Sequence, residues 1–549
     1  MLTLPPSSSI RNLVDVVFVA TLVLVMASFG WTGYLGSDDL SYAEAAEKWL
    51  EQAPYVGNTH WSLRYPVVLP IAADFAVLGL SELSLVLPTL LYHFGLLLVC
   101  GWTLRQHFDR PTAAIGVVTV ACIPLFAIWT TIAFPDVPET FFCLLSLALF
   151  VAALDKPKPR AALLASGVAA GLAWLTRESV IFFLLTYVLL FVRGYALPRR
   201  RYLLIAAGCF SVVAVESLFL LSATGNAFYR LSVTLRTHLH ADPTAGAASV
   251  ADRLGDMATR REFQVDGIFT ATGNLSVSRW FDPILAVLVN QEFMLFYYLA
   301  MPLIIWLVSV RRRALTPVQR RWLVPCGLAA LVWFAALWAQ IGMNLEPRYF
   351  MLPTAIAAMI AAVAVRRLLW ERSRGGTVLV AATFLSTSAL GIYFDKSEPL
   401  FGERALASLA RSTTEPVYTD PRTKGRGDLL YRIAGVEGRI HDTLPPDGAL
   451  FLYNPKYVER GSGAQRPHEL IAQLRPYRPG PTWEVIDRKQ QNRRWPGRLL
   501  EWARLSDRVP PELYRRLDRP NPAVTLYRVR DGTWQPDSGS EPSASAATR

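Results

Sequence analysis

Eleven long apolar segments occupy most of the first 394 residues, and they constrain the fold more strongly than any other sequence feature. About 20 apolar residues are enough for a helix to cross the hydrocarbon core of a bilayer. Only 18% of the chain is charged, against about 25% in an ordinary soluble protein. The sequence therefore predicts an α-helical polytopic membrane protein with about 11 transmembrane helices, and it excludes a soluble globular enzyme. The expected helices span residues 13–31, 84–104, 112–132, 138–154, 160–176, 179–193, 201–222, 293–310, 322–341, 349–366 and 376–394.

Basic residues in the connections between these segments indicate how the chain is oriented. Every second connection is short and rich in Lys and Arg, namely RQHFDRP, DKPKPR, RGYALPRRR, RRRALTPVQRR and RRLLWERSR. Because cytoplasmic loops keep the excess of Lys and Arg, we expect a cytoplasmic N-terminus in the inner (plasma) membrane and an external C-terminal part. The long loops 32–83 and 223–292 are then external. Pro66 to Leu80 is apolar but short, so we expect it to lie on the outer membrane surface or dip into it.

The net charge of +12 does not indicate a nucleic-acid partner, because no basic face with interleaved aromatic residues accompanies it. The five cysteines all lie inside apolar segments. Their positions predict neither a disulfide nor a cysteine metal site. Membrane lipids are the expected surroundings of most of the chain.

Beyond residue 394 the composition becomes that of an ordinary soluble domain. Three short β-branched and aromatic runs, PVYTD, ALFLYN and VTLYRV, alternate with helix-like stretches such as HELIAQL and GRLLEWARL. This pattern is typical of a small α/β or α+β domain. We therefore predict a membrane domain at 1–394, a soluble external domain at 395–536 and a disordered tail at 537–549, which is rich in Ser, Ala and Pro.

An acidic pair directly follows the first expected span. Asp38 and Asp39 stand at the start of a helix-like stretch whose apolar residues share one face. Two interpretations are open for them. Acids at a helix start satisfy free N–H groups and suit the helix dipole, whereas a carboxylate at the outer membrane surface can also accept a proton from a hydroxyl group.

A basic and aromatic group closes the same external loop. It contains His60, Arg64 and Tyr65, followed by Pro66. A guanidinium offers a bidentate fork and stays charged, which suits a phosphate at the membrane surface. Trp, Tyr and Arg also serve as simple interfacial anchors, so both roles are open for this group.

Further charged residues stand at the external ends of later spans. Acids at a membrane edge are costly and usually have a task, whereas exposed ion pairs contribute under about 1 kcal/mol. Together these residues describe a site that holds an anionic lipid phosphate while a carboxylate removes a proton from a hydroxyl group. They are Asp136, Glu139, Arg177, Glu178, Glu346, Arg348 and Tyr349.

The order of these motifs resembles that of the GT-C superfamily of polyprenyl-phosphate-sugar-dependent glycosyltransferases. The sequence contains SDDLSYAE, LRYP, FPDVPETFF, GLAWLTRES and EPRYF in that order, with TGNAFYRL opening the second large external loop. The likeness covers roughly residues 10–394. It is nearest to the branch that holds protein O-mannosyltransferases and the lipid A aminoarabinose and galacturonic acid transferases.

The resemblance implies a role for several of these residues. Asp38 corresponds to the proposed catalytic carboxylate and Asp39 to the second member of its pair, although the pair here is Asp-Asp where Asp-Glu is common. Asp136 corresponds to the second acid of the family pattern. Arg64 and Arg348 occupy positions that would face the donor phosphate. We therefore expect Asp38 and Asp136 to line one external cavity.

The implied activity is transfer of a hexosyl, pentosyl or uronosyl group from a polyprenyl-phosphate donor to a lipid, glycan or protein acceptor, with inversion. Lipopolysaccharide or protein glycosylation would be the setting. No cofactor is required, although His60 near carboxylates is compatible with a divalent metal. The alternative is a transporter or flippase of a lipid-linked sugar. Such proteins place charges near the bilayer midplane and often show inverted repeats.

Overall fold

The structure is a computed structural model that divides into two compact units. The first unit comprises Met1–Tyr34 and Ser41–Lys396, and the second comprises Leu35–Leu40 and Ser397–Arg549. The acidic segment Leu35–Leu40 therefore groups with the C-terminal unit, although it follows the first helix in the sequence. The residues described are 8–239, 260–265, 273–278, 282–310, 315–339, 345–395, 398–462 and 467–530.

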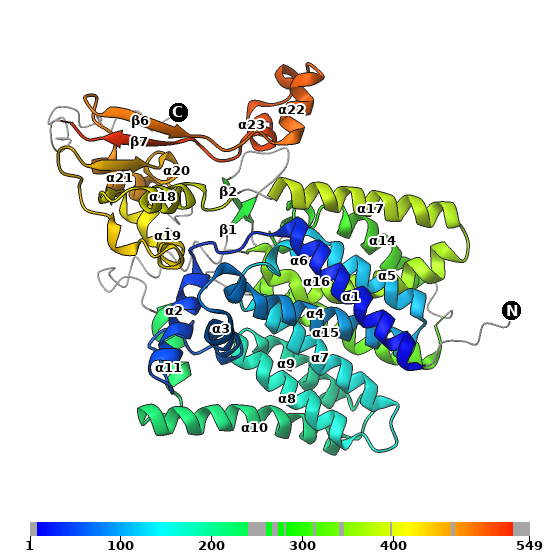
Figure 1. Cartoon of the computed structure of the whole chain (residues 1–549). Helices are drawn as coiled ribbons and strands as arrows, with labels where there is room; N and C mark the ends of the chain where they lie inside the picture. Colours follow the sequence, from blue (N-terminus) through cyan, green and yellow to red (C-terminus); the bar gives the residue numbers. More distant parts are fainter. Residues whose placement is uncertain are drawn as a thin grey trace. The chain divides into compact units, whose positions relative to one another are not determined.

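The first unit is built mainly from helices (Figure 1). It also contains two strands, β1 (Arg260–Val265) and β2 (Gly273–Ser278), which pair antiparallel. The helices are α1 Ser8–Gly30, α2 Asp38–Glu51, α3 Tyr65–Leu78, α4 Glu82–His107, α5 Arg110–Cys122, α6 Pro124–Trp129, α7 Asp136–Leu154, α8 Arg160–Thr176, α9 Val180–Arg193, α10 Arg199–Thr224, α11 Tyr229–Leu239, α13 Asp282–Val289, α14 Phe296–Ser309, α15 Pro317–Ala339, η2 Pro347–Phe350, α16 Met351–Ala364, η3 Val365–Trp370 and α17 Arg374–Asp395.

The expected apolar segments are helical, which confirms a polytopic, mainly α-helical membrane protein. Among the described residues, seven helices are long and apolar enough to cross a membrane, and five further apolar helices are shorter. The number of 11 spans stays a prediction. The expected span at 112–132 is divided into α5 and α6 at Pro124, because proline cannot donate the next helical hydrogen bond. The apolar stretch after Arg64 forms one of the shorter helices, α3.

Small residues let neighbouring helices of this unit approach closely. α8 packs between α7 and α10, and these helices run side by side in Figure 1. A Cβ on Gly167 would lie 2.0 Å from the Ile205 carbonyl oxygen, and one on Gly208 would lie 2.2 Å from that of Leu164. Only glycine fits at such contacts, which is the packing that membrane helices commonly use.

Buried hydroxyl groups join the other face of α8 to its neighbours. The Ser146 hydroxyl on α7 donates to the Ser166 carbonyl oxygen on α8 at 2.8 Å, and the Tyr187 hydroxyl on α9 lies 2.7 Å from that of Ser146. Hydrogen bonds of this kind hold membrane helices together where no water competes for the polar groups. The three helices therefore form a firm support for the residues at their ends.

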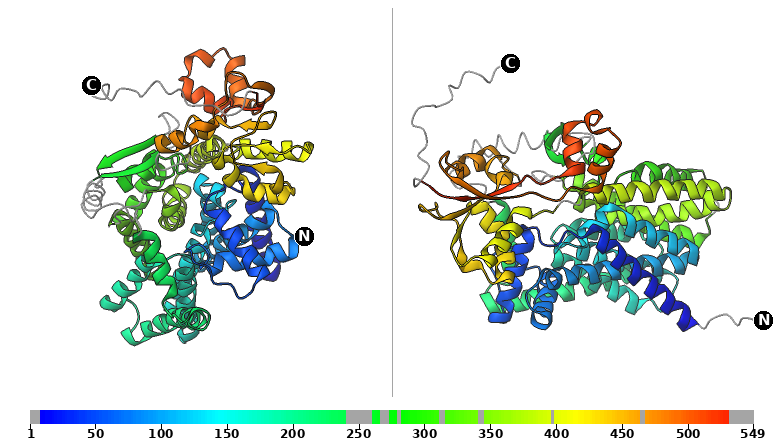
Figure 2. Two further views of the ribbon diagram at one scale, coloured as in Figure 1. Left: turned by 90° about the vertical axis from the view of Figure 1, so that its left-hand side faces the viewer. Right: turned by 45° about the horizontal axis from the view of Figure 1, so that its top comes forward.

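The second unit contains a mixed five-stranded sheet in the order β4-β3-β5-β7-β6. β3 pairs parallel with β4 and β5, whereas β7 pairs antiparallel with β5 and β6. The last two strands in the sequence, β6 and β7, are orange and red in Figure 2. The strands are β3 Val417–Tyr418, β4 Ile440–His441, β5 Leu450–Tyr453, β6 Glu484–Lys489 and β7 Val524–Arg528. The helices are α18 Phe401–Ser412, α19 Pro421–Ala434, η4 Glu437–Arg439, α20 Pro455–Val458, α21 Pro467–Leu474, η5 Arg475–Tyr477, α22 Trp495–Trp502, η6 Ser506–Arg508 and α23 Pro511–Asp518.

The three expected strands of this unit are present as β3, β5 and β7, so a small C-terminal domain with a sheet is confirmed. The sequence did not predict β4, which is only two residues long, or β6, whose six side chains are all exposed. Neither strand carries the apolar signal on which strand prediction depends. The expected tail at 537–549 lies outside the described residues.

Candidate functional site

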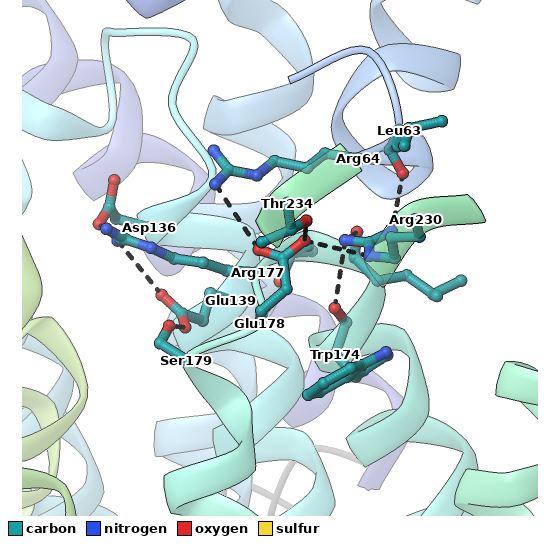
Figure 3. A network of polar contacts seen from close by, with 12 residues as sticks. Leu63, Arg64, Asp136, Glu139, Trp174, Arg177, Glu178, Ser179, Arg230 and Thr234 are labelled. Atoms are coloured by element: carbon teal, nitrogen blue, oxygen red, sulfur yellow. Dashed lines mark hydrogen bonds and ion pairs between the residues drawn. The ribbon is translucent and has the colours of Figure 1, made fainter. Parts of the chain in front are cut away.

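A buried ion pair between the ends of two helices forms the centre of the candidate site (Figure 3). Asp136 is the first residue of α7, and Arg177 directly follows α8. Arg177 Nη1 donates to Asp136 Oδ1 at 2.6 Å, and the Asp136 side chain is only 2% exposed. A buried carboxylate is costly unless it is paired, and the N-terminus of α7 also favours negative charge. The pairing with Arg177 and the N-terminus of α7 therefore both stabilise the buried carboxylate of Asp136.

Glu139 adds a second carboxylate on the next turn of α7. The Ser179 hydroxyl donates to Glu139 Oε1 at 2.6 Å. Arg177 Nη1 lies 3.9 Å from Glu139 Oε2. Two acids of the FPDVPETFF motif, Asp136 and Glu139, therefore share the Arg177 guanidinium. The proline-containing turn before α7 places both acids near this guanidinium.

Arg348 reaches the same carboxylate from a distant part of the chain. It lies in η2, with Nε 2.6 Å from Glu346 Oε2 and 3.9 Å from Asp136 Oδ2. Its guanidinium stands 4.4 Å from the ring centre of Phe134 and 5.3 Å from that of Trp129. A cation over aromatic faces is stabilised electrostatically, so the rings define where this charge is held.

Arg177 has two further guanidinium groups in its surroundings, those of Arg64 and Arg348. Arg177 lies over the ring of Tyr349 at 4.4 Å. It is near enough to Arg64 and to Arg348 for the like charges to repel each other. Each of the three is also paired with an acid: Arg177 with Asp136, Arg348 with Glu346 and Arg64 with Glu178. A phosphate group would bind here by sharing these guanidiniums with the acids.

Arg64 connects this centre to a fourth acid, Glu178. Its Nη1 donates to the Tyr42 hydroxyl, and its Nη2 lies 3.9 Å from Glu178 Oε2. Burial acts to raise the pKa of Glu178, but the charges of Arg230 and Arg64 outweigh it and hold this pKa below its ordinary value. Glu178 is therefore a carboxylate at neutral pH and balances the charge of Arg64.

Arg230 is a central member of the network that the sequence analysis did not select. Its Nη1 donates to Glu216 Oε1 at 2.8 Å and to the Leu63 carbonyl oxygen at 2.8 Å. Its Nε donates to Glu178 Oε1 at 3.1 Å, and its Nη2 donates to the Leu175 carbonyl oxygen at 3.0 Å. Arg230 thus ties α10, α11, the end of α8 and the loop before α3 together.

Two signals in the sequence point to this residue. Glu216 is an acid inside the long apolar run of α10, which is expensive unless a cation accompanies it. Arg230 belongs to the TGNAFYRL segment that carries part of the family resemblance. The Thr234 hydroxyl donates to Glu178 Oε1 at 3.2 Å. Ser179, Tyr42 and Thr234 were not predicted, because hydroxyl groups are too common in sequences to stand out.

The structure places His60 and Tyr65 differently from the arginines. The His60 ring stacks on Trp61 with 3.9 Å between ring centres. Tyr65 is buried and packs edge-on against Trp49 and Phe219. Tyr65 therefore contributes to packing beneath the site, and a binding role for either residue stays a prediction.

The acidic pair lies in the second unit, at the start of α2. Asp39 is fully buried, and its carboxylate accepts hydrogen bonds from the backbone N–H groups of Leu35 at 2.5 Å, Ser37 at 2.6 Å and Leu40 at 3.1 Å. Burial raises the pKa of Asp39 to about 6, against the lowering effect of these hydrogen bonds and of Arg426. Asp38 is only partly buried. The two acids of the pair therefore differ in burial and in hydrogen bonding. A cavity shared by Asp38 and Asp136 stays a prediction.

Among the described residues, no group of three or more His, Cys, Asp or Glu side chains is arranged to hold a metal ion. His60 is accordingly not part of such a group. The dependence of this protein on a metal stays a prediction.

Comparisons with known proteins describe the fold that carries this site. A family model described as dolichyl-phosphate-mannose-protein mannosyltransferase matches residues 66–221. That range contains Asp136, Arg177 and Glu178 but neither the acidic pair nor Arg348. The crystal structure of ArnT from Cupriavidus metallidurans in the apo state matches with a TM-score of 0.51 and 15% identity, over 88% of this chain and 97% of that chain. The chain has the fold of the GT-C glycosyltransferases.

A second solved structure has a similar fold. The oligosaccharyltransferase from Archaeoglobus fulgidus, in its complex with Zn and sulfate, matches with a TM-score of 0.50 and 13% identity, over 86% of this chain and 71% of that chain. A comparison with curated proteins gives no match. At these identities the structural matches describe the fold, and the chemistry must be argued from the site.

Proposed function

We propose that this GT-C protein is a glycosyltransferase of the inner membrane. It would move a sugar from a polyprenyl-phosphate donor to a hydroxyl group of a lipid, glycan or protein acceptor on the outer face. The fold, the mannosyltransferase family model and the order of the motifs support this class of reaction. The single observation that carries the proposal is the meeting of Arg64, Arg177 and Arg348 at the ends of membrane helices.

These arginines suit a leaving phosphate. When the bond between the anomeric carbon and the phosphate oxygen breaks, negative charge grows on the phosphate. Preorganised cations in a site with little water stabilise such charge strongly. The aromatic rings beneath Arg348 and Arg177 hold the two guanidiniums in place before the donor binds. The donor phosphate would share these guanidiniums with the acids that pair with them.

The acceptor needs a base, and the family resemblance assigns this role to Asp38. Its carboxylate would accept the hydroxyl proton as the acceptor oxygen bonds to the anomeric carbon and the phosphate leaves. Direct displacement inverts the anomeric centre. Asp39 does not suit the same role, because three backbone N–H groups already occupy its oxygens. This scheme requires no cofactor, and we expect transfer to persist when EDTA is present.

The position of the charges favours a transferase over a transporter. Asp136 begins α7, Arg177 follows α8, and Arg348 precedes α16. These are helix ends, where a phosphate head group meets the membrane surface. Transporters instead place their charged residues near the bilayer midplane.

Mass spectrometry of envelope glycolipids and glycoproteins from a deletion strain tests the proposal. We expect one sugar to be missing from its acceptor, with the unused polyprenyl-phosphate donor accumulating on the outer leaflet. Complementation with the parent chain should restore the sugar. An unchanged envelope would contradict the proposal, and accumulation of the donor on the cytoplasmic leaflet would indicate a flippase.

A further inference from the structure

The acidic segment Leu35–Leu40 belongs to the second unit. Within that unit it contacts helix α19. Arg426 on α19 donates from Nη2 to the Leu35 carbonyl oxygen at 2.7 Å. The Leu35 N–H group donates to Asp39, whose negative charge also feels the positive charge of Arg426. Arg426 therefore binds the backbone carbonyl oxygen of Leu35, and Asp39 binds its backbone N–H group.

A second contact between the two segments involves backbone on both sides. Gly36 has a φ of +64°, a conformation that other residues rarely adopt. A Cβ at this position would lie 2.1 Å from the Arg426 carbonyl oxygen. The turn before Asp38 therefore fits against α19 only because residue 36 is glycine. This contact is independent of the Arg426 side chain.

The helix that provides Arg426 is itself firmly held. Asp420 caps α19 by accepting the Thr423 N–H at 2.9 Å. The Arg426 guanidinium lies 5.8 Å from the ring centre of Tyr457, which is fully buried and donates to Glu403. A guanidinium supported in this way loses little freedom when it binds the Leu35 carbonyl group.

We propose that the C-terminal domain is a working part of the transferase, because it holds the turn Leu35–Leu40 and thereby positions Asp38. Arg426 is a positioning residue in this account, since it contacts the turn and not the substrates. The role in catalysis rests on the proposed function. The attachment of the turn to α19 does not, and it is tested separately.

Hydrogen–deuterium exchange of the turn tests the attachment in the full chain. We expect the amides of Leu35, Ser37 and Leu40 to exchange roughly tenfold faster, or more, in Arg426→Ala, because a charge-assisted hydrogen bond is lost. Gly36→Ala should have the same effect through the backbone contact. Lys424→Ala is the matched control, because Lys424 stands on the same helix and pairs with Asp442 instead. Parental exchange in both Arg426→Ala and Gly36→Ala would overturn the proposal.

Steady-state kinetics test the role in catalysis. We expect kcat to fall roughly tenfold or more in Arg426→Ala, with an unchanged KM for the polyprenyl-phosphate donor. Arg426→Lys should recover part of kcat, because lysine keeps the positive charge and can donate one hydrogen bond to Leu35. If the alanine variant does not fold, the lysine variant is compared with the parent instead. Faster exchange of the turn with a parental kcat would overturn the positioning role. If the parent chain transfers no sugar, the proposed function fails, and the exchange data still decide whether Arg426 holds the turn.

Discussion

Arg177 and Asp136 pair across the ends of α8 and α7, with Nη1 and Oδ1 2.6 Å apart and side chains that are 14% and 2% exposed. Neither charge is fully solvated, so each depends on the other for stability. The pair also brings Glu139 and Arg348 into one cluster. The same contact therefore supports the fold and organises the candidate site.

Replacing Arg177 with alanine should lower the free energy of unfolding by about 3 to 5 kcal/mol, because two buried carboxylates lose their shared cation. An SDS titration of the purified protein measures this loss. Arg321→Ala is the matched control, since Arg321 forms an exposed ion pair, 4.0 Å from Asp155. The control should change stability by less than about 1 kcal/mol. Equal stability of the two variants would mean that the buried pair does not support the fold.

Replacing Arg348 with alanine should weaken donor binding while folding is retained. Loss of a charge-assisted contact costs about 1.5 to 3 kcal/mol, which corresponds to roughly 10- to 150-fold in Kd. Binding of a polyprenyl phosphate to the detergent-solubilised protein gives this value. Arg372→Ala is the control, because Arg372 also stands over an aromatic ring, that of Trp306 at 5.4 Å. Unchanged affinity in both Arg348→Ala and Arg64→Ala would rule out the phosphate assignment.

Gly208→Val should separate α8 from α10. The new side chain would meet the Leu164 carbonyl oxygen, and overpacking of this kind costs about 1 to 3 kcal/mol or more. Gly327→Val on α15 is the control, because among the described residues no atom outside its own helix backbone and chain neighbours lies within 4 Å of a Cβ at that position. The midpoints of unfolding in SDS should therefore differ between the two variants. If they coincide, the close contact at Gly208 is not important for stability.

The buried carboxyl group of Asp39 should make stability depend on pH. Burial raises its pKa to about 6 from the ordinary 3.8. Because the folded pKa lies above the unfolded one, the stability that proton binding contributes is present below about pH 4 and is lost as the pH rises through about 6. Lowering the pH from about 7.5 to about 5 should therefore stabilise the parent relative to Asp39→Asn by about 1 kcal/mol. Parallel unfolding curves for the two proteins at both pH values would contradict this assignment.

The sequence predicts most helices of the membrane unit and several members of the candidate site. Apolar runs of this length have few alternatives to a helix in a bilayer, and the ends of the spans that we expect to be external carry the charges that meet around Asp136. Arg230 and Glu216 were not predicted as a pair, although Glu216 stands inside an apolar run, because the cation that accompanies this acid depends on how α10 and α11 pack.

The acidic pair shows a second limit of sequence analysis. Asp38 and Asp39 are equivalent in composition and position, and both suit a helix start. The structure separates them because Asp39 faces three backbone N–H groups and Arg426, more than 380 positions away in the chain. The difference arises from the direction in which each side chain points, which sequence spacing alone does not determine.

The most direct test of the account is the turnover of purified Asp38→Asn with a polyprenyl-phosphate sugar and envelope acceptors. Asparagine caps a helix about as well as aspartate, so the variant should fold and bind donor like the parent. It cannot accept the hydroxyl proton, and we expect turnover to fall about 10²-fold or more. Near-parental turnover of Asp38→Asn, measured beside an active parent, would contradict Asp38 as the base and favour the interpretation that the acidic pair only caps α2.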